Sequence, residues 1–121
     1  MDRDARPRVL LVEDEAILRR NLARLLERRG HDVLAVASIG EARALLREGT
    51  VDAAVLDVGL PDGDGLDLLP ETGASHSLVI SAEVDDGRLD ASGVAHFLRK
   101  PLELAAFARC VEGLVHGDRA A

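Results

Sequence analysis

With 121 residues, 47% of them hydrophobic, the chain is long enough for one compact domain with a single core and too short for two. A net charge of −7, from 15 basic and 22 acidic residues, argues against nucleic-acid binding, because such a domain repels phosphates. No apolar run approaches the roughly 18 residues of a membrane span, the start lacks a secretory signal, and one cysteine cannot form an internal disulfide, so we expect a cytoplasmic protein.

Short apolar runs alternate with amphipathic segments through the first half of the chain. The run 8–12 predicts a strand, and leucines at helical spacing predict a helix over 16–29. Residues 32–37 predict a second strand. The segment 38–49 opens with a serine three residues before a glutamate, which is a capping box, and it predicts a helix closed by the final glycine. The run 53–57 predicts a third strand that ends in an aspartate.

The same alternation continues through the second half. Residues 65–71 predict a short helix whose length a proline limits, and 77–81 predict a fourth strand. The segment 83–93 is only weakly helical, because its glycine and paired aspartates lower the helix propensity. A fifth strand is expected over 95–100. The last helix is expected over 101–115, with the proline in its first turn.

Five strands alternating with helices predict an α/β fold, a flavodoxin-like doubly wound parallel sheet in the order 2-1-3-4-5 with helices on both faces. We expect a single domain over residues 1–121, with a core of about 8–116. In this strand order the topological switch lies between the first and third strands. Ligands bind beyond the carboxyl ends of the strands at that point.

Polar side chains end the predicted strands at this edge. Three carboxylates a few ångströms apart would raise one another's pKa unless a cation lay among them, and an all-oxygen cluster suits Mg²⁺ or Mn²⁺. A metal and a lysine can together neutralise a phosphoryl group, a serine hydroxyl can donate to it, and a carboxylate beside the cation can attack phosphorus. Asp57 is the central candidate for that attack. The set comprises Glu13, Asp14, Asp57, Ser81 and Lys100.

The motifs LLVEDE, AVLDVGLPDGDGLDLL, VISAE and FLRKP, in this order, strongly resemble the receiver domain of two-component response regulators, including chemotaxis receivers. The resemblance covers nearly the whole chain. It implies a signalling phosphoacceptor rather than a dedicated enzyme. By this likeness a histidine kinase or a phosphotransfer protein phosphorylates Asp57 in a Mg²⁺-dependent reaction. The modified domain then switches its interaction with a downstream output domain or protein, and it binds no nucleic acid or membrane itself.

The resemblance also implies roles for single residues. Asp14 would bind Mg²⁺ directly beside Asp57, Glu13 would act mainly through water, and Gly59 would offer its backbone carbonyl. Ser81 and Lys100 would hold the phosphoryl oxygens, and Phe97 would take the switch-aromatic position that moves together with Ser81. Two features depart from the family pattern: the first acid is a glutamate, and the short spacings after the phosphoacceptor imply trimmed third and fourth helices.

Other interpretations of the same residues stay open. Asp57 can cap a turn, the acids after the first strand can favour a helix N-terminus, and Phe97 can be an ordinary core residue. Two other functions also stay open: a small Mg²⁺-dependent phosphohydrolase that uses an aspartyl-phosphate, and an interaction module that is never phosphorylated. The arginines of the first helix are expected on a solvated surface. The four histidines are expected on the surface or as hydrogen-bonded core residues.

Overall fold

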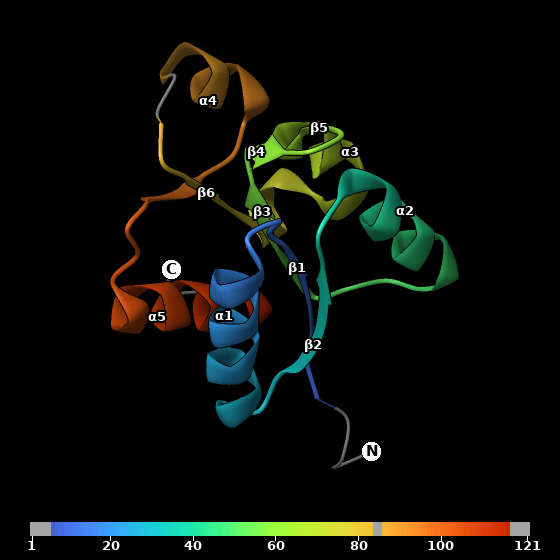
Figure 1. The fold of residues 1–121 in the computed structure, drawn as a ribbon, viewed down its shortest axis with the longest axis vertical. Coiled ribbons are helices and arrows are strands. Elements are labelled where there is room, and N and C mark those ends of the chain that lie inside the picture. Colours follow the sequence, from blue (N-terminus) through green and yellow to red (C-terminus); the bar gives the residue numbers. More distant parts are fainter. Residues whose placement is uncertain (1–5, 84–85, 117–121) are drawn as a thin grey trace.

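The computed structural model describes residues 6–83 and 86–116 (Figure 1). Val84 and Asp85, which belong to the weakly helical segment expected over 83–93, lie outside the described residues. Within the described ranges, no helix combines the length and the apolar character that crossing a bilayer requires.

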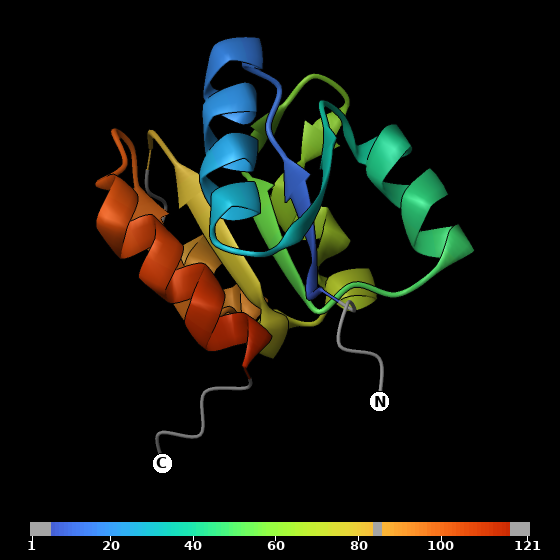
Figure 2. The ribbon, with the colours of Figure 1, turned by 90° about the horizontal axis from the view of Figure 1, so that it is seen from below.

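Five parallel strands form one sheet in the spatial order β2-β1-β3-β6-β7. Because β6 and β7 are the fourth and fifth strands of this sheet along the chain, this is the flavodoxin-like order that the sequence predicted. Helices cover both faces (Figure 2). The strands are β1 (Arg8–Val12), β2 (Asp32–Val36), β3 (Ala53–Asp57), β6 (Ser77–Ser81) and β7 (His96–Arg99).

The register brings the carboxyl ends of the strands to one edge of the sheet. Val12 at the end of β1 lies beside Leu56 of β3, and the next residue of β3 is Asp57. Ser81 at the end of β6 lies beside Arg99 of β7. Since all five strands run in the same direction, the residues that follow them meet at this edge.

The helices differ greatly in length, and the third and fourth are short, as predicted. A two-stranded hairpin after β3 was not expected; it is formed by β4 (Gly59–Leu60) and β5 (Gly63–Asp64). Two 3-10 turns, η1 (Gly65–Leu68) and η2 (Ala74–His76), flank the third helix. The α-helices are α1 (Ala16–Arg28), α2 (Ile39–Glu48), α3 (Leu69–Thr72), α4 (Asp86–Ser92) and α5 (Leu104–Val115).

Local capping explains where two of these helices begin. In α2, Ser38 Oγ accepts from the Glu41 N–H at 3.2 Å, which confirms the predicted capping box. The expectation that α5 starts with Pro101 in its first turn was wrong. Glu103 is the N-cap instead, since its carboxylate accepts from the backbone N–H groups of Ala105 and Ala106, and the helix starts at Leu104.

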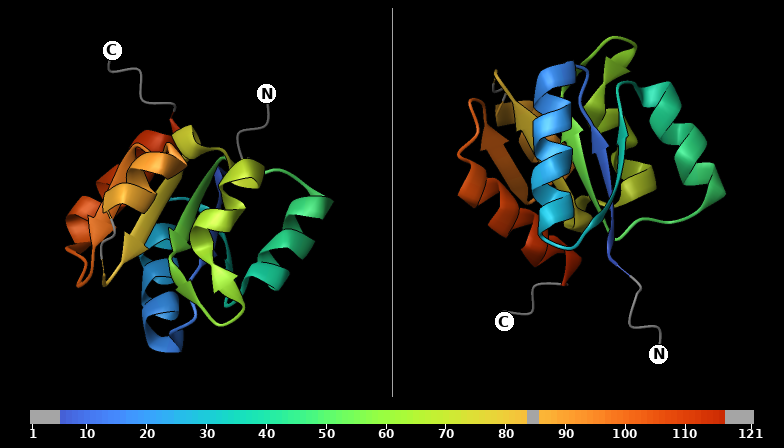
Figure 3. Two further views of the ribbon diagram at one scale, coloured as in Figure 1. Left: turned by 90° about the horizontal axis from the view of Figure 1, so that it is seen from above. Right: turned by 60° about the horizontal axis from the view of Figure 1, so that its bottom comes forward.

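Two hydrophobic cores lie on opposite faces of the sheet. On one face α1 and α5 pack side by side against alternate residues of the central strands (Figure 3). On the other face the core is built from α2, η1 and α3. No described residue of α4 belongs to either core, and Figure 1 shows α4 standing apart from α2 and α3.

Candidate functional site

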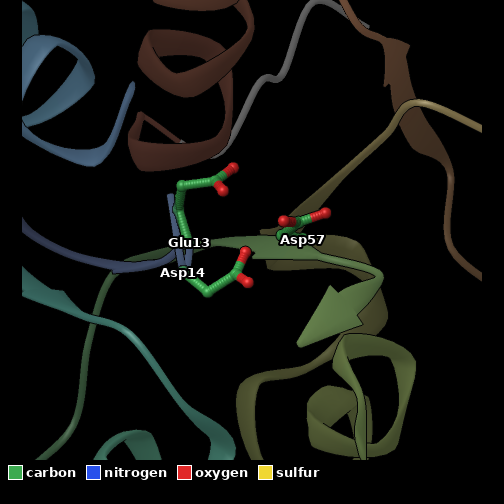
Figure 4. Close-up of side chains that lie close together, drawn as sticks. All are labelled: Glu13, Asp14 and Asp57. Atoms are coloured by element: carbon green, nitrogen blue, oxygen red, sulfur yellow. The ribbon is translucent and has the colours of Figure 1, made fainter. Parts of the chain in front are cut away.

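Three carboxylates meet at the carboxyl edge of the sheet (Figure 4). Glu13 and Asp14 directly follow β1, and Asp57 is the last residue of the neighbouring strand β3. One oxygen of each carboxylate lies within 4.8 Å of the others. The strand order therefore brings together the acids that the sequence predicted, at the topological switch point.

Lys100 supplies a cation to this cluster. It follows β7, and its backbone N–H donates to the Ser81 carbonyl at 2.9 Å. Its Nζ lies 2.8 Å from Glu13 Oε1 and 3.2 Å from Asp57 Oδ2. Burial acts to lower the pKa of Lys100, but the two carboxylates outweigh burial and raise that pKa above its ordinary value. The ammonium group is therefore charged at neutral pH.

Glu13 is completely buried, whereas Asp14 is exposed. Glu13 Oε2 accepts from the Glu15 backbone N–H at 3.0 Å. Its Oε1 has no hydrogen-bond partner among the described residues, and the 2.8 Å contact with Lys100 is an ion pair outside hydrogen-bond geometry. Since an unpaired buried charge is costly, the position of Glu13 depends on Lys100.

The backbone of the acid pair is held by Arg19 of α1. Its Nη1 donates to the carbonyl of Glu13 at 2.9 Å and to that of Asp14 at 3.3 Å. This corrects the expectation that all arginines of the first helix are solvated. Nothing in the sequence distinguishes Arg19 from the other arginines of α1, because the contact depends on how the chain turns between β1 and the helix.

Asp57 is 5% exposed and accepts two polar contacts. Lys100 Nζ lies 3.2 Å from Oδ2, and the Gly59 N–H donates to Oδ1 at 3.4 Å. Burial raises the pKa of Asp57, and the charge of Glu13 raises it further. Lys100 opposes both, and the resulting pKa is about 6 instead of 3.8. The site therefore disfavours the third negative charge that it must carry at neutral pH.

This arrangement fits a hard divalent cation. Three carboxylate oxygens converge, and the raised pKa of Asp57 reports repulsion and desolvation that a dication would relieve. Exposed Asp14 leaves one side of the cluster open to water, and Mg²⁺ prefers few carboxylates together with several waters. The donor set contains no sulfur or imidazole, so it suits Mg²⁺ better than zinc.

Ser81 and Phe97 lie at the same site. The Ser81 hydroxyl is engaged with its own loop: it donates to the Glu83 carbonyl at 2.5 Å and accepts from the Glu83 N–H at 3.1 Å. Phe97 of β7 is half-buried and lines the same cavity as Ser81 and Asp57. The structure therefore brings the two predicted switch residues to one cavity, with the hydroxyl turned toward the loop.

Gly65 makes an unusually close approach to the phosphoacceptor candidate. A Cβ added there would lie 2.0 Å from the Asp57 carbonyl oxygen, and the Gly65 N–H donates to the Val58 carbonyl at 3.1 Å. Only glycine allows this approach. Gly59, the other glycine of interest, lies exposed in β4, two residues beyond Asp57.

The cavity around these residues measures about 830 Å³. It extends from the acids toward α4, where Leu66, Arg88 and Leu89 line it. Arg88 forms an ion pair with Asp64 of β5. The ion pair between Arg88 and Asp64 could not be predicted from the sequence. The segment that contains Arg88 is only weakly helical, and its distance from β5 depends on the tertiary fold.

Comparisons with known proteins agree with this geometry. The sequence matches the response regulator receiver domain family over residues 9–112. It is 38% identical to the virulence transcriptional regulatory protein PhoP of Salmonella typhimurium over 104 residues, which cover 80% of this chain and 46% of that protein. It is 45% identical to the transcriptional regulatory protein PhoP of Escherichia coli over 62 residues, covering 51% of this chain and 28% of that protein. The chain thus spans less than half the length of these relatives.

Solved structures show the same fold. A CheY-like receiver domain protein from Methanospirillum hungatei superposes with a TM-score of 0.86, at 19% identity, over 96% of this chain and 98% of that chain. A LuxR-family two-component response regulator from Aurantimonas has a TM-score of 0.79 at 30% identity, over 95% of this chain and 89% of that chain. The fold, the acidic edge and the family match lead to one conclusion: this chain belongs to the response regulator receiver domain family, the receiver module of two-component signalling proteins.

Proposed function

We propose that Asp57 accepts a phosphoryl group from a histidine kinase or a phosphotransfer protein in a Mg²⁺-dependent reaction. Phosphorylation then changes how the domain interacts with a downstream output domain or protein. The main support is the position of Asp57, a buried carboxylate next to the Lys100 ammonium and two further acids. In this proposal residues 1–121, with a core of about 8–116, form a single receiver domain of a cytoplasmic signalling protein, and this domain contacts neither nucleic acid nor membrane directly.

The chemistry follows from the contacts. A carboxylate oxygen of Asp57 attacks the donor phosphorus, an O–P bond forms, the donor's P–N bond breaks, and imidazole leaves with the electron pair. Lys100, now 3.2 Å from Asp57, moves to a phosphoryl oxygen. Glu13, Asp14, Asp57 and the Gly59 carbonyl would hold Mg²⁺, which would supply positive charge to the acids and the phosphoryl group. Hydrolysis reverses the modification: water attacks the same phosphorus, the O–P bond to Asp57 breaks, the Asp57 carboxylate is restored and inorganic phosphate leaves, so the domain takes part in both reactions.

The hydroxyl of Ser81 links this chemistry to the fold. It must release the Glu83 backbone to donate to a phosphoryl oxygen, and this exchange pulls the 81–83 loop toward Asp57. Phe97 lines the same cavity as Ser81, so a shift of the loop changes the space available to the ring. These two coupled movements are the proposed switch.

Intact-mass measurement with acetyl phosphate and Mg²⁺ tests the assignment. We expect one phosphoryl adduct on the parent protein and none on Asp57→Asn. Asp52→Asn is the matched control: Asp52 lies exposed just before the opposite end of the same strand, and asparagine keeps the acceptor for its 2.7 Å contact with the Arg8 N–H. An Asp57→Asn protein that is labelled as fully as the parent would disprove the proposal.

Titration with Mg²⁺ tests the metal ligands separately. Asp14→Ala should weaken Mg²⁺ binding by roughly tenfold or more, and by more than Glu13→Gln, because the proposal makes Asp14 a direct ligand and Glu13 a ligand mainly through water. Equal losses in the two variants would contradict this ranking.

The other two functions predict different results in these assays. A phosphohydrolase would turn over a small phosphoester repeatedly, and a constitutive interaction module would show no adduct in the parent protein. The cavity gives the phosphohydrolase no specific support, since the charged residues that line it besides the acid, hydroxyl and lysine set are Glu15, Glu83 and Arg88, which border the same acids.

A further inference from the structure

A second cation lines the cavity that contains Asp57. Arg88 of α4 lines this cavity together with Asp57 and Lys100. Among the described residues, Arg88 and Lys100 are the two cations that line it. The Arg88 side chain is 49% exposed, and its Nη2 pairs with Oδ2 of Asp64, which is 20% exposed. This ion pair joins α4 to β5, the hairpin strand that follows the phosphoacceptor candidate.

Asp64 uses its two oxygens differently. Oδ1 accepts from the Leu66 N–H at 2.8 Å and caps η1, whereas Oδ2 contacts Arg88. An asparagine in this position would keep the cap, because its side-chain oxygen is also a good N-cap acceptor. The charge that attracts Arg88 can therefore be removed without removing the cap.

Charge balance favours a role for Arg88 at the phosphorylated site. The three clustered carboxylates exceed the charge of Lys100 by two, and one bound Mg²⁺ cancels that excess. Phosphorylation replaces the single charge of Asp57 with about two, so the site gains a negative charge that neither Lys100 nor the metal balances. Glu15 and Glu83, which also line the cavity, add to this excess. Arg88 is the cation positioned to balance it.

We propose that Arg88 is a second phosphoryl-binding residue, and that its guanidinium exchanges Asp64 for the phosphoryl oxygens when Asp57 is phosphorylated. A planar guanidinium donates two N–H groups to phosphate oxygens at once, which suits it to this role. The exchange moves α4 toward the acids; this helix has no described residue in either core, so few contacts resist the movement. The inference rests on Asp57 as the phosphorylated residue.

The exchange makes Asp64 a competitor of the phosphoryl group, so two variants should shift affinity in opposite directions. The assay is titration of the protein with beryllofluoride, a phosphoryl mimic, in the presence of Mg²⁺. Arg88→Ala should weaken binding roughly three- to tenfold, and Arg88→Lys should recover part of that loss. Asp64→Asn should tighten binding by roughly twofold or more, because Arg88 is then released at lower cost.

Three results separate the possible failures. If Arg88→Ala and Asp64→Asn both weaken beryllofluoride binding, the ion pair only holds α4 against β5 and the inference is wrong. Unchanged affinity in both variants also overturns it, provided that Asp57→Asn abolishes binding, since the proposed function then survives. If Asp57→Asn binds the mimic as well as the parent does, the phosphoacceptor assignment itself fails. Thermal unfolding of each metal-free variant checks that the fold is retained.

Discussion

The two faces of the sheet are packed very differently. On the face covered by α1 and α5, long helices place fully buried side chains over the central strands, among them Leu22, Leu26, Phe107 and Val111. On the opposite face α2 contributes Ile39 and Ala42, the four-residue α3 contributes Leu69, and no described residue of α4 takes part.

This difference separates a well-packed scaffold from the lightly packed elements that the proposed switch would move. Glu13 and Asp14 follow β1 and Asp57 ends β3. Both strands contribute residues to the two cores, so the positions of the acids are fixed by packing. The Ser81 loop, the β4–β5 hairpin and α4 adjoin the cavity on the lightly packed side. Elements with few buried apolar contacts open at low free energy, and switching segments are drawn from such elements. The variants below test this comparison, from the largest expected effect to the smallest.

The same substitution on the two faces should give the largest contrast. Leu22→Ala on α1 should lower the free energy of unfolding by about 2–5 kcal/mol, because Leu22 is fully buried and a cavity would remain. Leu89→Ala on α4 should cost less than about 1 kcal/mol, since Leu89 is only half-buried and alanine favours the helix. Urea unfolding in metal-free buffer measures both. Similar losses would mean that α4 is anchored as firmly as α1.

A methyl group added at Gly65, where η1 approaches the end of β3, should have the next largest effect on stability. Gly65→Ala should lower the free energy of unfolding by about 1–3 kcal/mol and weaken Mg²⁺ binding, because its Cβ would meet the Asp57 carbonyl oxygen at 2.0 Å. Gly113→Ala in α5 is the control: its Cβ would meet nothing within 4 Å, so it should stabilise by about 0.4–1 kcal/mol. Unfolding and Mg²⁺ titration of both variants provide the comparison, and equal stability changes would refute it.

The negative charge of Asp57 should lower the free energy of unfolding of the metal-free domain by a smaller amount. The pKa of Asp57 in the folded domain, about 6, lies above its ordinary 3.8, so the folded state binds the proton more tightly. The contribution of Asp57 to the stability of the metal-free domain should therefore rise as pH falls from about 7 toward 4, and Asp57→Asn should stabilise that domain by about 1–2 kcal/mol at pH 7. Melting curves across pH measure this. A gain that persists undiminished near pH 4 would rule out this explanation.

The smallest effect is expected at His31, which lies where the well-packed face approaches the end of α5. Its ring is buried, and neither nitrogen has a hydrogen-bond partner among the described residues, which corrects the expectation of a satisfied histidine. Burial lowers its pKa below 6.5; Glu112 opposes this, and His116 and Arg29 lower the pKa further. The stability that a neutral His31 provides is present above about pH 6.5 and is lost at lower pH.

His31→Leu removes this titration. From about pH 7.5 to about pH 5.5 the stability of the parent should therefore fall relative to that of the variant. At pH 7.5 the two should differ by less than about 1 kcal/mol, because leucine replaces an unsatisfied ring with an apolar side chain of similar size. Parallel pH profiles for the two proteins would show that His31 is not titrating in this range.

Much of the fold and of the acid cluster was determined by the sequence alone. Apolar runs that end in polar residues specify buried parallel strands, and parallel strands bring their ends to one edge whatever the helices do. For this reason the sequence alone predicts that one group of side chains meets at this edge: Glu13, Asp14, Asp57, Ser81 and Lys100. The start of α2 was equally predictable, since the bond between Ser38 and Glu41 spans only three residues.

The contacts that tune the site were decided only by the tertiary structure. Arg19 on the backbone of the acids, Arg88 on Asp64 and the Asp57 carbonyl against Gly65 each depend on where separate elements come to lie. The start of α5 at Leu104 and the hairpin after β3 were also missed, because weak local preferences there are outweighed by a side-chain cap and by pairing across a turn. Packing between distant segments thus determines which arginine meets which carboxylate, since an ion pair forms only where the fold brings two charges within a few ångströms.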